Sequence, residues 1–557
     1  MLAGCCAGIA CSLGHAAAQE PATEQKAPIS AEAAPSSAGK IPSFPELEAA
    51  GAVIGEVRID VRNIFDLADE KENAFLYRAA NGVHIQTREW VVRRQLLFKP
   101  GERVSARLIE ETERVLQSSR NFYDVTIMAL GYRDGVVDIE VKTRDTWSLE
   151  PGGRASRAGG VNTTGWSALE RNFLGTGVLI SAGRLRDADR SGTQYRVSQP
   201  HAFDGWTAIE YSHAQLSDGG TSAASIARPF YALDARWAAG FSTSTDTRID
   251  SVFSNGERIS QVRHRQDKAE TFGGWSAGLV DGWVHRYSVG FSYLKDTYKV
   301  EPDLSLPPPD PFPLDQTLAA PFLRYELVHD DYEKVKNRDL IERPEYFAMG
   351  TQSSVQLGRA LTGLGSTQDL WLYSVSASDG FRLPSNRVLL GSASVSGQTG
   401  YAPLDRQLAS GSVRSYSHSD SRTLTFVSLA GDALRDPNLA NQLVLGGDTG
   451  LRGYPRGYQT GDRRVLLNVE ERLYTDWYPF RLFRVGGAAF YDWGRAWDGP
   501  GESPSSAHWL SNVGFGLRIL SARSSLGNIL HVDIAFPLNR DPNIKSFQFL
   551  VMTKASL

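Results

Sequence analysis

Alternation of apolar and polar side chains is the dominant pattern in the second half of the chain. In residues 484–494 one face carries Val485, Gly487, Ala489, Tyr491 and Trp493, and the other carries Arg484, Gly486, Ala488, Phe490, Asp492 and Gly494. Residues 465–472, 512–520 and 530–536 repeat this period of two, which predicts strands with two different environments. Alternation alone also fits a soluble sandwich. Glycines and charges share one face here, which favours a membrane β-barrel whose polar lumen admits closely packed backbone.

A mixed pattern comes before these strands. Val57, Ile59 and Val61 alternate as a strand, and helices are predicted over 87–97 and from an N-cap at Ser105 to about 117. Alternation on both sides of Arg133-Asp134-Gly135 predicts a β-hairpin. Residues 51–146 are therefore predicted to form one small α+β domain of order β-α-α-β-β, and residues 147–557 the barrel.

The first residues have the composition of targeting and linker segments. Residues 1–18 are apolar, contain all three cysteines and end in Ala16-Ala17-Ala18, which predicts a secretory signal peptide without its basic beginning. The sequence Leu2-Ala3-Gly4-Cys5 also resembles a lipoprotein box, so lipidation of Cys5 is the alternative. Residues 19–50 are rich in Pro, Ala and Ser and are predicted to be a flexible leader.

Composition excludes several classes of protein. The net charge of −4 in 557 residues gives no basic excess to neutralise phosphates, so nucleic acid is not an expected partner. No run of about 18 apolar residues follows the predicted signal peptide, which argues against membrane helices. A membrane barrel passes this test because only one face of each strand is apolar.

The predicted barrel has roughly sixteen antiparallel strands, at about ten residues a strand plus turns. The first strand would run from Ser148 to Arg157, and the last over 546–557 with Phe547 and Phe549 facing outward. The first strand contains Pro151-Gly152-Gly153, which weakens a hydrogen-bonded ladder. The junction between first and last strands is therefore predicted to be the weakest, and these strands form a candidate lateral gate.

Three short motifs carry a family resemblance. The segments Leu451-Arg452-Gly453-Tyr454, NVEER (468–472) and FYDWG (490–494) resemble the signature of the BamA/TamA-like outer-membrane assembly and secretion superfamily, also called the surface antigen type. In that family a loop with such a tip folds back into a sixteen-stranded barrel, and its arginine meets acids on the inner wall. The resemblance implies that Arg452 pairs with Asp492 and Glu470, which alternation also places on the inward face.

The α+β domain resembles a POTRA domain, the periplasmic module of the same superfamily, most clearly between residues 99 and 145. Only one copy is visible, whereas BamA-like proteins carry more. The resemblance implies an outer membrane of a Gram-negative-type bacterium, with the POTRA domain in the periplasm and lipids around the barrel. It also implies client polypeptides, bound by strand addition at the POTRA edge and at the junction of first and last strands.

The function that follows is assistance with inserting or translocating other polypeptides at the outer membrane. The alternative is a passive pore or structural barrel without insertase activity. Neither of these two functions requires catalysis, a cofactor or a metal ion, so we expect the protein not to be an enzyme and to bind no cofactor or metal. Gly274-Trp275-Ser276-Ala277-Gly278 matches the GxSxG nucleophile motif, but no strand-turn-helix context surrounds it, so a barrel strand is the preferred interpretation.

Two further stretches have simple interpretations. The charged run 330–343 is interpreted as a solvated loop. The aromatic residues Tyr474, Trp477, Tyr478 and Phe480 gather at a predicted turn, which is typical of the girdle that a barrel places at the membrane interface.

Overall fold

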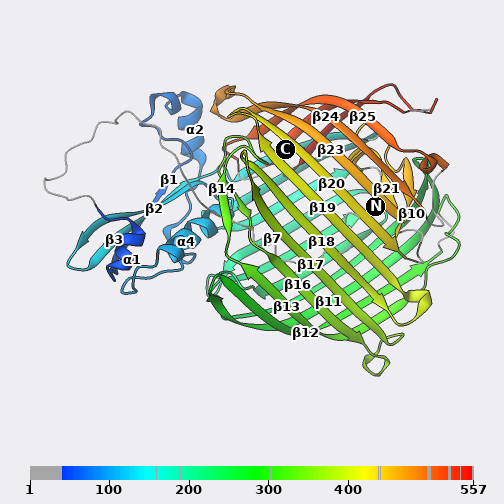
Figure 1. Ribbon diagram of the computed structural model, residues 1–557, viewed down its shortest axis with the longest axis horizontal. Helices are drawn as coiled ribbons and strands as arrows, with labels where there is room; N and C mark the ends of the chain where they lie inside the picture. The colour runs from blue at the N-terminus through cyan, green and yellow to red at the C-terminus, as the bar shows by residue number, and fades with distance from the viewer. Residues whose placement is uncertain are drawn as a thin grey trace.

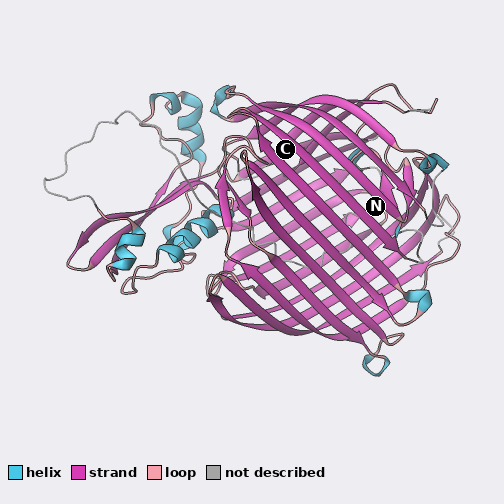
Figure 2. Cartoon of the chain, viewed as in Figure 1, coloured by secondary structure: helices cyan, strands magenta, loops and turns pink. Residues whose placement is uncertain are grey.

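The chain folds into a small α+β domain followed by a large β-barrel (Figures 1 and 2). The computed structural model describes residues 41–554, except 159, 188–189, 301–303, 437, 439–440, 499–503, 525–527, 540 and 543. The predicted signal peptide, Cys5 and most of the predicted leader lie outside the described residues. None of the described helices is long and apolar enough to cross a bilayer.

The small domain is a three-stranded sheet covered by helices. Its elements are α1 (Phe44–Ala49), β1 (Val53–Arg62), η1 (Glu70–Glu72), α2 (Phe75–Val83), α3 (Glu89–Arg93), α4 (Ala106–Ser118), β2 (Phe122–Arg133) and β3 (Val136–Asp145). The sheet order is β1-β3-β2, with β1 parallel and β2 antiparallel to β3. The β2–β3 turn has Asp134 at φ 50° and Gly135 at φ 80°, a left-handed pair that suits a tight hairpin.

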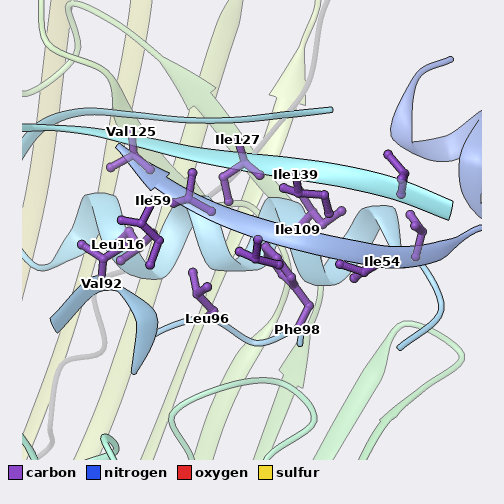
Figure 3. Packing of buried hydrophobic residues seen from close by; sticks show 14 of the residues in the cluster. Ile54, Ile59, Val92, Leu96, Phe98, Ile109, Leu116, Val125, Ile127 and Ile139 are labelled. Carbon is purple, nitrogen blue, oxygen red and sulfur yellow. The ribbon is translucent and has the colours of Figure 1, made fainter. Parts of the chain in front are cut away.

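The core of this domain lies between the sheet and α4. Ile109 and Leu116 on α4 meet Ile59, Ile139 and neighbouring strand residues, as Figure 3 shows. The burial of these side chains follows the alternation read from the sequence, because successive strand residues point to opposite faces.

The helices differ from the prediction in two places. The helix expected over 87–97 is only the five-residue α3, and α2 was not predicted at all. The leader expected to reach residue 50 ends earlier, because α1 begins at Phe44 and Leu47 is fully buried in the domain core.

The barrel is an antiparallel sheet in which the last strand returns to the first. In the part of the chain that the structure describes it has twenty strands. They are β4 (Leu149–Ala158), β5 (Val161–Phe173), β6 (Val178–Arg186), β7 (Ser191–Ala202), β8 (Thr207–Leu216), β9 (Gly219–Arg228), β10 (Trp237–Ser254), β11 (Glu257–Val280), β12 (Trp283–Lys299), β13 (Gln316–His329), β16 (Gln352–Ala360), β17 (Leu370–Leu383), β18 (Arg387–Thr399), β19 (Arg406–His418), β20 (Thr423–Arg435), β23 (Arg463–Tyr474), β24 (Phe483–Trp497), β25 (Leu510–Ser521), β26 (Ile529–Pro537) and β27 (Gln548–Lys554).

The prediction of a closed antiparallel barrel is confirmed, but the expected sixteen strands were too few. Several neighbouring strands are joined by very tight turns. For example, only residues 217 and 218 separate β8 from β9, which are ten residues each. Strands and turns of this size use less chain than the prediction allowed, so the same length forms more strands.

Two short hairpins lie outside the barrel sheet. β14 (Tyr332–Val335) pairs with β15 (Glu345–Ala348) between barrel strands β13 and β16. β21 (Leu443–Leu445) pairs with β22 (Gln459–Gly461) between β20 and β23. Figure 1 shows β14 at the barrel end next to the small domain and β21 near the opposite end.

Candidate functional site

The loop between β20 and β23 carries Leu451-Arg452-Gly453-Tyr454 and folds into the barrel interior. Leu451 and Tyr454 are fully buried, and Arg452 is only 4% exposed. The Tyr454 hydroxyl donates to the carbonyl oxygens of Ser511 (2.9 Å) and Asn539 (2.6 Å). The backbone N–H of Gly453 donates to Asn512 Oδ1 at 3.1 Å, and a Cβ on Gly453 would lie 2.7 Å from Asn512 Cβ. Only glycine allows this approach to the wall.

Arg452 binds two carboxylates of the inner wall. Its Nε and Nη2 donate to Asp492 Oδ2 and Oδ1 at 2.8 and 2.6 Å, a bidentate pair, and its Nη1 donates to Glu470 Oε1 at 2.7 Å. The guanidinium also lies over the Phe490 ring, 3.4 Å from its centroid. Bidentate and stacking geometry together fix the orientation of a guanidinium, which a lysine ammonium would not match. We call this contact the loop latch.

The latch belongs to a larger cluster of buried charges. Asp533 Oδ2 lies 3.5 Å from Arg452 Nη1, and Asp533 Oδ1 accepts a hydrogen bond from Arg518 Nη1. Glu470 Oε2 accepts from Arg472 Nε at 3.2 Å. Asp492 accepts further hydrogen bonds from Asn468 and Asn512, each at 2.8 Å. Three arginines thus face three acids, and this balance is what makes burial of so many charges tolerable.

Sequence reasoning named Arg452, Asp492 and Glu470 but missed Phe490, Asp533 and Arg518 as members of this cluster. All three missed residues stand on the inward face that alternation predicts. The pattern of alternation does not give the register between neighbouring strands, and the register determines which inward side chains lie at the same height in the barrel. In the structure Asn512 lies opposite Asp492, and Gly516 lies opposite Asp533.

A second segment enters the barrel from the end nearest the small domain. The run 330–343 is interpreted from the sequence as a solvated loop, and that interpretation is wrong. Asn337, Arg338, Ile341 and Arg343 are buried, most of the other residues are half-buried, and the run includes strand β14. Ile341 packs against Tyr416, Tyr474, Leu520 and Ile529. The carbonyl oxygen of Arg338 accepts from Arg472 Nη1 at 2.8 Å, so this segment touches the charge cluster of the latch.

The polar groups of this inward segment find partners within it, which explains how a charged run can be buried. Glu345 accepts from the backbone N–H groups of Arg338 (3.0 Å) and Asp339 (2.9 Å), and Asn337 exchanges hydrogen bonds with Glu342. Burial and the negative charge of the nearby Asp339 together raise the pKa of the Glu345 carboxyl to about 8, although the hydrogen bonds from backbone N–H groups act in the opposite direction. Tyr474, predicted to be in the interfacial girdle, is instead buried against this segment.

Helix α4 of the small domain rests on the same hairpin. Lys334 Nζ pairs with Glu113 Oε1 at 2.8 Å, and the guanidinium of Arg114 lies 4.6 Å from the centre of the Tyr332 ring. Glu111 accepts from the backbone N–H of Leu233, in the turn after β9, at 2.8 Å. The hairpin therefore connects the small domain to the interior of the barrel (Figure 1).

The junction of β27 and β4, which we call the seam, has the sparsest pairing in the barrel. Within the described residues its register is one pair, Val551 opposite Arg157, whereas each other pair of neighbouring strands has at least seven. Phe547 and Phe549 are exposed, and Ser148, just before β4, is buried. Lys554 of β27 lines a cavity of about 100 Å³ together with Arg452 and Glu470, so the last strand borders the latch.

The GxSxG segment lies in a setting unlike a nucleophile elbow. Ser276 is buried within β11, which continues to Val280 and is followed by strand β12 rather than by a helix. Its hydroxyl oxygen accepts from the backbone N–H of Gly278 at 3.0 Å. Among the described residues, no group of three or more His, Cys, Asp or Glu side chains could hold a metal ion.

The fold and site define a closed antiparallel barrel with an inward latch loop and one α+β domain at its mouth. No protein-family model and no curated protein matches the sequence. Among solved structures, BamA from Haemophilus ducreyi lacking POTRA domains 1–3 is 13% identical over 90% of this chain and 84% of that chain, with a TM-score of 0.38. CdiB from Escherichia coli is 14% identical over 90% and 76%, with a TM-score of 0.47.

The FrpB iron transporter from Neisseria meningitidis also resembles the chain, at 8% identity over 77% of this chain and 78% of that chain and a TM-score of 0.36. At such low identities and TM-scores, none of these likenesses assigns a function to this chain.

Proposed function

We propose that this protein is an outer-membrane barrel that assists the insertion or translocation of other polypeptides, with its small domain acting as a POTRA module in the periplasm. The observation that carries the proposal is the seam. Among the described residues one registered pair joins β27 to β4, while strands β23 to β26 hold the charge cluster around Arg452. A sparsely paired junction can open and expose a strand edge while the strands beside it stay joined by their buried ion pairs.

Placement in a membrane is supported by the outer face of the barrel. Large apolar side chains alternate outward on many strands and are exposed, which in water would be an aggregation hazard. They include Leu323, Val355, Leu357, Val375, Val413, Leu429, Phe515 and Leu517. An apolar band of this kind is what a bilayer core requires of a barrel.

Strand addition to the small domain is supported by its sheet order. β2 is an edge strand, and no described strand pairs with its outer side. An extended client segment could hydrogen-bond there without any particular side-chain chemistry. In the proposed mechanism the client pairs first with β2 and then with the open seam. No covalent step and no cofactor is involved.

The test is a disulfide bond across the seam, which oxidation forms and reduction breaks. In a chain with Cys5, Cys6 and Cys11 changed to serine, Arg157→Cys and Val551→Cys are introduced at the facing positions, and the protein is reconstituted into liposomes. Unfolded outer-membrane barrel polypeptides are added, and their folding is followed by heat-modifiable gel mobility. We expect oxidation to slow folding to the rate of empty liposomes, and reduction to restore it.

A matched control places the cysteine pair at Val375 and Val355, which face each other within a fully paired part of the wall. Oxidation there should change nothing. Equal folding rates with the seam locked and unlocked would contradict the proposal. Ion conductance together with an absence of any acceleration of folding would favour the passive pore instead.

A further inference from the structure

Helix α2 of the small domain turns an apolar face away from its own domain. Phe75 is 79% exposed, Leu76 54% and Val83 72%, and Ala79 between them is exposed as well. Residues four apart lie on one side of a helix, so these positions form a continuous face. The opposite side packs inward, where the Tyr77 ring lies 4.6 Å from the Phe65 ring.

The helix is held against the rim of the barrel. The Tyr77 hydroxyl donates to the carbonyl oxygen of Phe480 at 2.9 Å. Arg481 Nη1 lies 3.3 Å from Asp69 Oδ2 and 3.4 Å from Glu72 Oε1, just before α2. Figures 1 and 2 show α2 next to the short helical turn at this edge of the barrel. The position of the apolar face relative to the barrel wall is therefore set by specific contacts.

The rim beside α2 is itself apolar and exposed. In the turn between β23 and β24, Trp477 is 64% exposed and Phe480 71%. Leu473 at the end of β23 and Phe483 at the start of β24 continue the exposed apolar surface onto the outer wall. Trp and other aromatic side chains are enriched where a barrel meets the membrane interface.

We propose that the α2 face, made of Phe75, Leu76, Ala79 and Val83, docks on the phospholipid leaflet next to the small domain, together with Trp477 and Phe480. The occupant is lipid because the face continues the apolar outer surface of the barrel wall. A client taken up by strand addition would need an unpaired strand edge, which a helix does not offer. An amphipathic helix lying in the interface buries its apolar side chains among acyl chains.

The test uses single cysteines on the full chain, again with Cys5, Cys6 and Cys11 changed to serine. Phe75→Cys and Val83→Cys are labelled with an environment-sensitive fluorophore, and the protein is reconstituted into phospholipid nanodiscs. Lipids with a spin label on the acyl chain and iodide in the water are added as separate quenchers. We expect loss of emission with the labelled lipids and little loss with iodide at both positions.

Two matched positions make the result specific. Leu130→Cys lies at an exposed position of the same domain but belongs to strand β2, and it should be quenched by iodide only. Val375→Cys on the outer barrel wall should be quenched by the labelled lipids only. The inference rests on membrane placement of the barrel, and Val375 reports that placement separately.

The outcomes are distinct. Lipid quenching at Val375 without lipid quenching at Phe75 and Val83 overturns the docking of α2 and leaves the barrel in the membrane. No lipid quenching at Val375 overturns membrane placement itself. Protection of Phe75 from iodide that depends on added unfolded polypeptide, or energy transfer between labelled copies, would show a client or a second copy on this face and would also overturn the proposal.

Discussion

Arg472 of strand β23 donates a hydrogen bond to the carbonyl oxygen of Arg338 at 2.8 Å, and this contact joins the inward segment to the barrel wall beside the latch. Arg472 also pairs with Glu470, which binds Arg452 of the latch loop. Arg338 belongs to the segment whose hairpin contacts α4 through Lys334 and Glu113. A continuous series of polar contacts therefore runs from the small domain to the latch.

Loss of Arg452 should destabilise the barrel more than loss of a surface arginine. We expect Arg452→Ala to lower the free energy of unfolding by about 3–5 kcal/mol, because the buried Asp492 carboxylate would lose its arginine partner while Glu470 would keep Arg472. The measurement is the melting temperature on semi-native gels. Arg463→Ala is the control, since its pair with Asp498 is exposed at the surface and should contribute about 0–1 kcal/mol.

The double variant Arg452→Ala/Asp492→Ala separates pairing from general damage. Removing Asp492 as well takes away the unpaired charge, so the double variant should melt no lower than Arg452→Ala alone. Losses that simply add would show that the two residues act independently.

Gly516 should not tolerate a side chain. A Cβ at this position would collide with the carboxylate of Asp533, which pairs with Arg518 and lies beside Arg452. We expect Gly516→Ala to cost about 1–3 kcal/mol through overpacking. Gly487→Ala is the control, because its Cβ would come no closer than 3.6 Å to the nearest atom. Equal melting temperatures for Gly516→Ala and Gly487→Ala would show that the Asp533 carboxylate can shift without loss of stability, which would contradict this prediction.

Truncation of Ile341 tests whether the inward segment is part of the folded core. Ile341 is buried among Tyr416, Tyr474 and Leu520, so Ile341→Ala should cost about 2–5 kcal/mol. Leu364→Ala, at an exposed position in the turn after β16, should have little effect. Indistinguishable melting curves for Ile341→Ala and Leu364→Ala would show that the segment around Ile341 is solvated, which would contradict this prediction.

Stability should fall with rising pH because of Glu345. Its pKa is raised from the usual 4.5 to about 8, so the folded segment keeps a proton that the unfolded chain releases. The contribution of Glu345 to the free energy of unfolding is therefore fully present below pH 4.5 and is lost as the pH rises through about 8. Glu345→Gln should remove this dependence, as measured by hydrogen exchange of residues 336–348 corrected for intrinsic rates. An unchanged dependence in the variant would assign it to another group.

The sequence predicted the barrel class and the central latch contact for clear reasons. Alternation fixes the face of each residue, and the motif around Arg452 places an arginine opposite inward acids. The number of strands was wrong because turn lengths leave no strong signal in the sequence. Asp533 and Arg518 were missed as partners because their contact with the latch depends on register.

The inward segment was missed for a different reason. Its charged composition predicts contact with water, but in the structure Glu345 accepts hydrogen bonds from backbone N–H groups and Arg338 forms an ion pair with Glu333. Local composition cannot distinguish a charge in solvent from a charge with a buried partner. Helix α2 was missed because Ala74 provides no capping side chain at its start, and its last turn contains Asn81-Gly82, residues typical of a turn.

The seam has unequal sides. β27 borders the cavity beside Arg452, and the strands before it share the cluster of Glu470, Asp492 and Asp533. β4 is instead the strand that continues directly from the small domain, after Trp147. If the seam opened, β27 would stay anchored beside the charge cluster, whereas β4 would move together with the small domain to which it is directly connected.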